Sequence, residues 1–331
     1  MPMRLAVAPM MAWTDRHCRA LHRILAPDAW VFTEMVVANA LRHGPRDRLL
    51  RYDASEHPVA IQLGGNDPEM LAWASRLAAE HGYDAINLNV GCPSGRVQNG
   101  TFGACLMREP RLVAECLRAM REAVSIPVSI KTRLGLEDCD TYDFLSGFVD
   151  AVRASGVTQF IMHARIAILD GLTPAQNRDV PPLQPDRVKR LKQDFPELTV
   201  IVNGGIDTTA MVEQSMRWAD GVMIGRAAYH NPMWLAELQE LLFSKRIHTV
   251  DAPLRALQAF EPYIGRELDR GTRLHDITRH MLGLFAGMPG ARKFRRHLSE
   301  HARSPGAGLD VLRDACAHIE TATRHRAGVY A

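Results

Sequence analysis

One cysteine of the chain lies where it could transfer a proton. Cys92 stands between a glycine and a proline, directly after an apolar run, so it should occupy an exposed loop. A protonated thiol held there can donate its proton to a carbanion-like centre. Most single cysteines are instead small buried hydrophobic residues. Cys105, Cys116 and Cys316, which fall in predicted helices, are interpreted in that way.

A lysine and two glycine-containing segments indicate a phosphate-bearing cofactor. Lys131 lies near the end of another apolar run, and a buried lysine costs free energy unless it meets an anion. Gly204-Gly205 and Gly225-Arg226 end two further runs, where backbone N–H groups can approach a phosphate. Glycine pairs are also ordinary turn residues, and Lys131 could instead form an ion pair with Glu34. Arg226 supplies the cation that favours the phosphate interpretation.

Other polar side chains end the same kind of apolar run. His163 and Arg165 lie two residues apart, and alternate residues of a strand share one face. A strand histidine alone is usually part of the core, but its pairing with an arginine favours recognition of an anion or a base. Gln62, Asn89 and Asn203 add amide groups at the ends of three more runs.

The elements that must position these residues form a regular series. Apolar runs without strict alternation are typical of parallel strands buried on both faces. Eight such runs, with helical patterns between most of them, predict an α/β fold, a (β/α)8 TIM barrel; a doubly wound open sheet is the competing arrangement. Working residues of such a barrel project from the carboxyl ends of its strands. The predicted strands span residues 5–9, 31–35, 59–64, 85–91, 127–133, 159–165, 199–205 and 221–226.

The chain changes character after Ser244, where no further strand-like run appears. We therefore predict a barrel domain over residues 1–245 and a C-terminal all-helical bundle domain over 246–331, and we expect a monomer because these two parts account for the whole chain. Helices are predicted at 254–268, 274–285, 291–302 and 309–323.

Positive charge is concentrated in this helical tail. Residues 1–250 contain 27 Lys and Arg against 28 Asp and Glu, whereas residues 251–331 contain 13 against 9. On a helix Arg292, Arg295 and Arg296 would share one face. Most charged helix faces are merely solvated, but three arginines in a row also suit contacts with the phosphates of a nucleic acid.

The six cysteines form no CxxC pair and no metal-ligand spacing, so no metal site is expected. No apolar run is long enough to span a membrane. The N-terminal apolar stretch is followed by Thr14-Asp15-Arg16 instead of a small-residue cleavage site. These features predict a cytoplasmic protein with reduced thiols.

Short motifs that cover nearly the whole predicted barrel, in order, resemble those of the tRNA-dihydrouridine synthases. Two further details, residues 96–100 and Asn177-Arg178 followed by 181–183, are similar to the A-type bacterial subfamily, which acts on the tRNA D-loop. The motifs are Ala8-Pro9-Met10, residues 13–19, Gln62 to Gly65, Asn87 to Ser94, Lys131 to Arg133, His163 to Arg165, Asn203 to Ile206 and Gly221 to Arg226.

The resemblance implies a specific reaction. It implies bound FMN, NADPH as reductant, and reduction of D-loop uridines in tRNA to 5,6-dihydrouridine, with a hydride added to C6 of uracil and a proton from Cys92 to C5. The target uridine must be flipped out of the tRNA, which costs a few kcal/mol.

The resemblance also assigns residues to these ligands. Asn89, Arg96, Arg133 and Arg178 would contact the uridine or its neighbours, and the tail would hold the rest of the tRNA, where Arg292 and Arg295 are the expected phosphate contacts. FMN would be held by Pro9, Met10, Met11, Gln62, Lys131, His163, Asn203, Gly204, Gly205, Gly225 and Arg226.

Two departures and two alternatives remain open at this point. Ala12 stands where the subfamily usually has an acidic residue, and Ile166 and Ile168 replace a usual lysine and aromatic residue. An FMN barrel of the dihydroorotate dehydrogenase kind, acting on a free pyrimidine, would share the same site without needing a basic tail. A non-catalytic RNA-binding barrel would not need the flavin.

Overall fold

The computed structural model describes residues 2–95, 100–247 and 252–329, with side chains up to residue 324. The chain divides into two compact units. The first, the barrel unit, comprises Met1–Thr14 and Ala29–Gly225, and the second, the helical unit, comprises Asp15–Asp28 and Arg226–Ala331. The predicted boundary at 245/246 therefore lies inside the helical unit, which also includes a segment from near the N-terminus.

Eight parallel strands form the centre of the barrel unit, in the order β1-β8-β7-β6-β5-β4-β3-β2. All eight predicted strands are confirmed, with ends that differ by a few residues. They are β1 (Leu5–Val7), β2 (Val31–Val37), β3 (Val59–Gly64), β4 (Ala85–Val90), β5 (Val128–Thr132), β6 (Gln159–His163), β7 (Thr199–Asn203) and β8 (Gly221–Ile224).

The two outermost strands of this order meet through a parallel bridge between Ala6 and Trp30. Val7 N donates to Trp30 O at 2.8 Å, and Trp30 N donates to Leu5 O at 2.9 Å. The sheet is therefore a barrel, and the alternative of an open doubly wound sheet is wrong. Side chains such as Phe32 and Ile161 fill the interior as a packed core.

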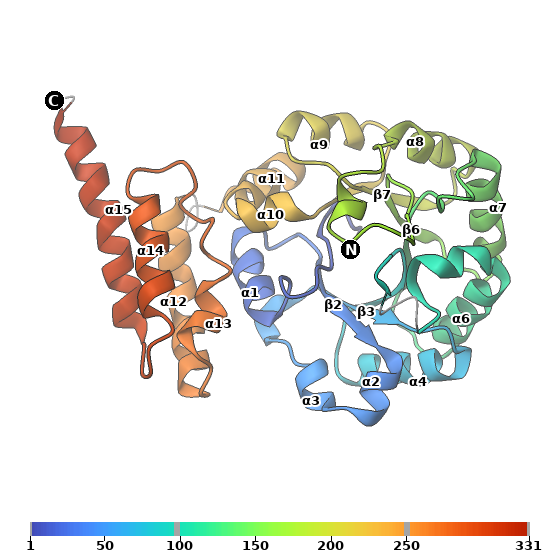
Figure 1. Cartoon of the computed structure of the whole chain (residues 1–331), viewed down its shortest axis with the longest axis horizontal. Helices are drawn as coiled ribbons and strands as arrows, with labels where there is room; N and C mark the ends of the chain where they lie inside the picture. Colours follow the sequence, from blue (N-terminus) through green and yellow to red (C-terminus); the bar gives the residue numbers. More distant parts are fainter. Residues whose placement is uncertain (1, 96–99, 248–251, 330–331) are drawn as a thin grey trace. The chain divides into compact units, whose positions relative to one another are not determined.

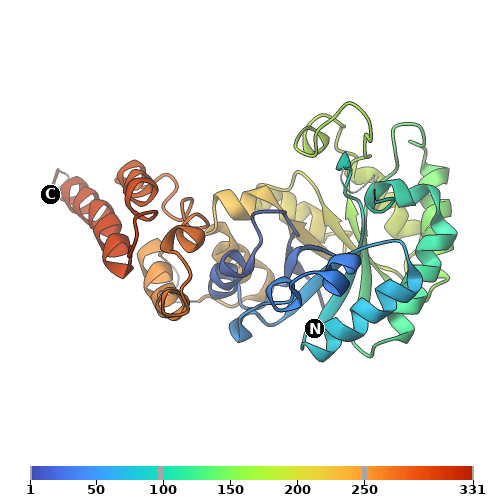
Figure 2. The same cartoon turned by 60° about the horizontal axis from the view of Figure 1, so that its bottom comes forward.

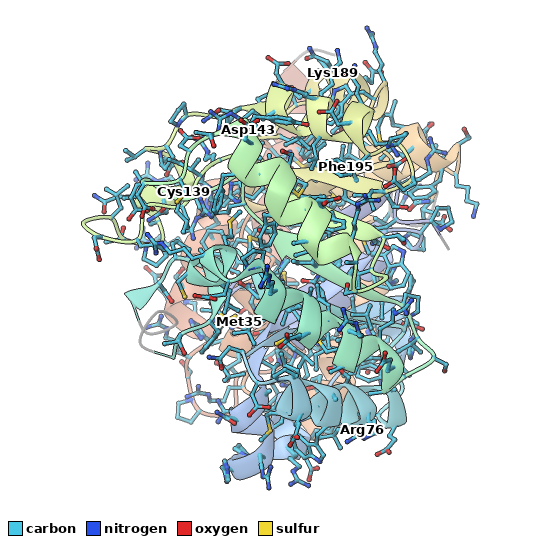
Figure 3. All side chains as sticks on the ribbon, turned by 90° about the vertical axis from the view of Figure 1, so that its right-hand side faces the viewer. Met35, Arg76, Cys139, Asp143, Lys189 and Phe195 are labelled. Atoms are coloured by element: carbon cyan, nitrogen blue, oxygen red, sulfur yellow. The ribbon has the colours of Figure 1, made fainter. Side chains whose placement is uncertain are left out.

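Helices surround this barrel (Figure 1). Asp67 caps α4 as predicted, since its side chain accepts from Met70 N at 3.0 Å, and Gly82 past the end has a φ of +94°. Figure 3 faces the outer layer, with Arg76 labelled on α4, Asp143 on α7 and Lys189 on α8. The helices are α2 (Ala38–His43), α3 (Arg46–Leu49), η1 (Ala54–Glu56), α4 (Pro68–Glu80), η2 (Gly103–Arg108), α6 (Pro110–Glu122), α7 (Tyr142–Arg153), η3 (Gln176–Arg178), α8 (Pro185–Asp194) and α9 (Thr209–Met216).

The helical unit contains only helices and turns among its described residues. Helices α12, α14 and α15 lie side by side in both Figure 1 and Figure 2. None of the helices in the described ranges is long and apolar enough to cross a membrane. The helices are α1 (Arg16–Leu25), α10 (Arg226–His230), α11 (Trp234–Phe243), α12 (Pro253–Asp269), α13 (Leu274–Thr278), α14 (Ala291–His301) and α15 (Leu309–Val329).

One predicted helix is wrong in length. The helix expected over 274–285 ends at Thr278 and continues as turns. A β-carbon on Gly283 would lie 2.1 Å from the backbone oxygen of His230, so this segment approaches another backbone closely. The apolar period of the sequence continues through the segment and does not reveal that approach.

Polar contacts bind α1 into the helical unit. His17 Nδ1 and the Tyr263 hydroxyl lie 2.8 Å apart, and Arg16 Nη2 donates to Glu267 Oε2 at 2.9 Å. Asp15, the N-cap of α1, accepts hydrogen bonds from Arg279 at 2.5 Å and His280 at 2.9 Å. The first helix in the sequence is therefore held by residues about 250 positions later in the chain.

Candidate active site

A chain of amide side chains crosses the barrel interior. Gln62 Nε2 donates to Asn87 Oδ1 at 2.8 Å, and Asn89 Nδ2 donates to Gln62 Oε1 at 2.8 Å. Asn87 Nδ2 in turn donates to Ser129 Oγ at 2.9 Å, and Thr33 Oγ1 accepts from Gln62 N at 3.0 Å. Buried amides are stable only when hydrogen-bonded, so this chain fixes the orientation of Gln62 and Asn89. Sequence reasoning missed Ser129 and Thr33, whose roles depend on strand register.

Lys131 lies beside this chain and has no carboxylate partner in the part of the chain that the structure describes. Its Nζ donates to Asn203 Oδ1 at 3.0 Å, and Asn203 Nδ2 donates to Met223 O at 2.8 Å. The alternative ion pair with Glu34 is not formed, since Glu34 Oε1 instead accepts from Ala12 N at 2.5 Å. Burial and the nearby Arg133 guanidinium lower the pKa of Lys131 to about 7. The geometry leaves this ammonium suited to an anionic ligand.

Gly204 and Gly205, two of the glycines predicted to lie near a phosphate, must be glycine for conformational reasons. Gly204 and Gly205 have φ angles of +109° and +68°. A β-carbon on Gly204 would lie 2.7 Å from His163 Cδ2, and one on Gly205 would lie 2.2 Å from Leu183 Cδ1. Both positions therefore need glycine for the fold alone.

Gly225 lies in an open setting by comparison. A β-carbon there would meet only Ala8 Cβ at 3.9 Å and Met10 Sδ at 4.0 Å. The surrounding protein therefore leaves room for an alanine side chain at this position. Because the fold does not require glycine here, the glycine is consistent with a ligand that approaches the backbone closely. Arg226 follows it in the chain and begins α10 of the helical unit.

Three arginines converge on the loop between β6 and α8. Arg133 is buried, and it donates to Gly91 O at 2.9 Å, Ile166 O at 2.7 Å and Asn177 O at 3.0 Å. Burial, together with the nearby charges of Arg178 and Arg165, lowers the pKa of Arg133 to about 10 against an opposing effect of Cys92. Arg133 thus joins the Cys92 loop to the loop after β6, a structural task that the sequence did not indicate.

His163 lies among these cations. Its ring packs against Gly204. Burial and the charges of Arg133, Lys131, Arg165 and Arg178 hold the pKa of His163 well below its usual range. His163 is therefore neutral at physiological pH and can both donate and accept a hydrogen bond.

The Cys92 loop is fixed by the amide chain. Asn89 Oδ1 accepts from Gly91 N at 3.1 Å and from Cys92 N at 3.0 Å. The half-buried Cys92 places its Sγ 3.5 Å from Ser94 Oγ. Burial raises the pKa of Cys116 and of Cys316 to about 12, as expected for thiols that act as small hydrophobic residues.

The remaining predicted site residues lie in several places. Pro9 and Met10 are half-buried after β1, whereas Met11 is 62% exposed. Arg96 lies outside the described residues. Arg292 and Arg295 are exposed on α14, and Arg296 on the same face forms an ion pair with Glu300 at 2.8 Å. No group of metal-ligating side chains appears in the described part of the chain.

Comparison with known proteins decides the family. A family model described as dihydrouridine synthase (Dus) matches residues 6–320. The chain belongs to the dihydrouridine synthase family.

Similar members of the dihydrouridine synthase family include three curated bacterial proteins, each named tRNA-dihydrouridine(20/20a) synthase. The one from Yersinia pestis is 52% identical over 317 residues, which cover 96% of this chain and 91% of the relative. The one from Vibrio cholerae is 53% identical over 317 residues, covering 96% of both chains. The one from Xanthomonas campestris is 52% identical over 322 residues, covering 97% and 95%.

Solved structures show the same barrel at low identity. Morphinone reductase has a TM-score of 0.52 at 15% identity, covering 72% of this chain and 85% of its own. A 2-naphthoyl-CoA reductase has a TM-score of 0.54 at 10% identity, covering 73% and 50%. These likenesses establish the (β/α)8 fold of this member of the dihydrouridine synthase family.

The departures from the family pattern have local explanations. Ala12 adopts a φ of +62° and donates its N–H to Glu34. Asn177 holds the backbone of Ile168 through two bonds of 2.8 Å. Because these contacts use the backbone of Ile168, they do not depend on the type of side chain at this position.

Proposed function

We propose that this chain reduces D-loop uridines of tRNA to 5,6-dihydrouridine, with bound FMN and with NADPH as reductant. Membership of the dihydrouridine synthase family and the names of the relatives support this reaction and substrate.

The donor set fits FMN. The observation that carries the proposal is Lys131, a half-buried ammonium whose described contacts include an amide but no carboxylate. Close to it lie the oriented amides of Gln62 and Asn203, and Gly225 has space in front of its backbone. Pro9, Met10, Met11, His163, Gly204, Gly205 and Arg226 complete the proposed FMN-binding set.

FMN, once reduced, supplies the hydride for C6 of the uracil. Cys92 then has the task of protonating C5 from Sγ. Lys131 and Arg133 both lie near enough to Cys92 for a thiolate there to raise their pKa. The same two cations would therefore stabilise the thiolate that remains after proton transfer. Asn89 positions Cys92 through two backbone N–H groups.

Four polar residues, in β4 and in the segments after β4, β5 and β6, are proposed to contact the flipped uridine or its neighbours. They are Asn89, Arg96, Arg133 and Arg178. The Nε and Nη1 groups of Arg133 donate hydrogen bonds to backbone carbonyls. We therefore propose that its Nη2 group faces the substrate.

We infer further that residues 1–245 carry the catalysis and residues 246–331 hold tRNA, with Arg292 and Arg295 as phosphate contacts. We also infer that the protein acts as a monomer in the cytoplasm. Six free cysteines and a tRNA substrate support the compartment.

A comparison of the wild-type protein with one variant tests the reaction. Wild-type protein should form dihydrouridine in unmodified tRNA with NADPH, whereas Cys92→Ala should lose at least about a hundredfold in rate, as expected for a general acid, and keep its flavin absorbance. Undiminished activity in the variant would remove Cys92 from the mechanism. Turnover of free uracil or dihydroorotate but not of tRNA would favour the free-pyrimidine alternative.

A further inference from the structure

A group of basic side chains lies on the flank of the barrel unit, between α2 and α3. Arg42, His43, Arg46 and Arg48, here named the flank cluster, are all exposed within seven consecutive residues. Arg42, His43 and Arg46 line an open hollow of about 420 Å³ together with Asp47. Figure 1 shows α2 and α3 on the outside of the barrel.

The charge of the flank cluster is not neutralised within the described residues. Its three arginines form no ion pair there, and Asp47 is the one carboxylate in the segment. Some other basic side chains of the barrel unit do have partners: Arg108 lies 2.8 Å from Asp138, Arg153 lies 2.8 Å from Asp150, and Lys192 lies 2.9 Å from Asp220. The flank cluster differs in gathering several exposed basic side chains, without ion pairs in the described ranges, into one short segment.

The segment that carries these charges is anchored. Arg46 Cζ lies 5.2 Å from the centroid of the Trp73 ring, and Arg46 Nε donates to Leu41 O at 2.8 Å. Leu41 and Leu50 are buried on either side. Because the backbone is held, a phosphate bound here would cost little ordering of the loop.

The flank cluster also lies near the end of the barrel that carries the candidate active site. Helix α2 begins at Ala38, directly after β2 ends at Val37, and the carboxyl ends of the strands carry Cys92 and Lys131. A helix of six residues covers about 9 Å, so Arg42 and His43 lie a short way down the flank from that rim. A long polyanion with one nucleotide at the mouth of the barrel can continue over this flank.

We propose that the flank cluster binds the sugar-phosphate backbone of tRNA, as a contact of the barrel unit that is separate from Arg292 and Arg295. This proposal rests on the proposed function, because it takes tRNA as the substrate. Arginine is suited to the role, since its planar guanidinium can donate two parallel hydrogen bonds to one phosphate.

The test compares two double variants with the same change in net charge, in the full-length, FMN-loaded protein. Arg42→Glu/Arg48→Glu changes the flank cluster and spares Arg46, which packs on Trp73. Arg118→Glu/Lys189→Glu changes two exposed cations on α6 and α8 that form no ion pair in the described part of the chain; Figure 3 marks Lys189. The probe is an unmodified tRNA transcript, and Kd is measured from about 50 to 200 mM salt.

We expect the flank variant to raise Kd about tenfold at low salt and to reduce the slope of log Kd against log salt by about 2, one for each lost phosphate contact. The control variant should change both by much less. Its KM for tRNA should stay near that of wild type, whereas the flank variant should show a raised KM with kcat retained.

Equal effects of the two variants, or none from the flank variant, would overturn the proposal, as would a wild-type protein that does not bind the transcript. Binding without any dihydrouridine formation would overturn the proposed function alone, because the salt slopes would still report on the flank cluster.

Discussion

Lys131 is half-buried and has no carboxylate partner among the described residues, so its ionisation should control the binding of an anion. With a pKa of about 7, Lys131 loses its charge as the pH rises from 7 towards 9. We expect the affinity of the apoprotein for FMN to fall over that range. Lys131→Met should weaken binding about tenfold at pH 7 and remove the trend, as measured by quenching of flavin fluorescence.

Lys131→Arg provides the control, since arginine remains charged at pH 9. It should retain FMN affinity and show no pH trend. A wild-type affinity that stays constant from pH 6 to 9 would contradict the assignment of Lys131 to the cofactor.

Gly225 and Gly204 offer a matched pair of substitutions. Gly225→Ala should leave the melting temperature nearly unchanged and weaken FMN binding, because the new methyl group would make only ordinary contacts with Ala8 and Met10 but would obstruct the ligand. Gly204→Ala should destabilise the apoprotein by about 1 to 3 kcal/mol, since it combines a positive φ with a clash against His163. Thermal unfolding of both apoproteins, followed by flavin titration, separates these outcomes. Unaltered FMN binding by Gly225→Ala would exclude that glycine from the cofactor site.

Residue types at strand ends allowed much of this site to be predicted. Lys131, Gln62, Asn89 and Cys92 all lie towards the carboxyl ends of barrel strands, so composition and position were sufficient to predict where they lie, while their roles remain predictions. The backbone contacts of Arg133 could not be predicted in that way, because Gly91, Ile166 and Asn177 come together only through loop geometry. No sequence period encodes that convergence.

At the scale of elements, α14 presents two exposed arginines without an ion pair among the described side chains, beside a third that has one. Arg292→Glu/Arg295→Glu should therefore weaken tRNA binding and reduce its salt slope by about 2. Filter binding at several salt concentrations measures both. Arg296→Glu should have a smaller effect, because Glu300 already offsets that charge, and an unchanged slope in the double variant would remove α14 from the interface.

Strands were predicted more reliably than tail helices for a physical reason. A buried parallel strand needs a continuous apolar run, as in Ile86 and Leu88 of β4, and few other structures produce one. The turns after Thr278 contain the buried Met281, Leu284 and Phe285 at helical spacing. Their departure from a helix depends on the approach of Gly283 to another backbone segment, which local sequence does not report.

At the scale of the whole molecule, the helical unit is held together by a buried carboxylate. Burial works against ionisation of Glu267, but hydrogen bonds from Arg270 and Arg16 outweigh it and lower its pKa to about 2. Because the folded pKa lies below the unfolded one, this stabilisation is complete above about pH 4.5 and is lost as the pH falls towards 2.

Glu267→Gln should accordingly lower the free energy of unfolding by about 2 to 3 kcal/mol at pH 7 and flatten the loss of stability in acid. Denaturant unfolding between pH 3 and 7 measures this. Glu300→Gln, in an exposed pair, should change stability by less than about 1 kcal/mol. Equal effects from the two variants would show that the buried network contributes no more to stability than an exposed ion pair.

The division into units also affects how tRNA binding can be studied. Truncation at residue 245 would remove Tyr263, Glu267 and His280, the partners of α1. A truncated protein that fails in activity would therefore report unfolding as readily as loss of tRNA binding. Point variants on α14 and in the flank cluster avoid this ambiguity.

The placement of α1 has a consequence for biosynthesis. Arg16 emerges from the ribosome long before Glu267, which lies 251 residues later. At about 5 to 20 residues per second, the helix waits roughly 10 to 50 seconds for its partner. During that interval the nascent chain exposes apolar side chains such as Leu21 and Leu25, which are fully buried in the finished protein. A chain that stops early never covers them, so chaperones and proteases can distinguish incomplete copies from finished ones.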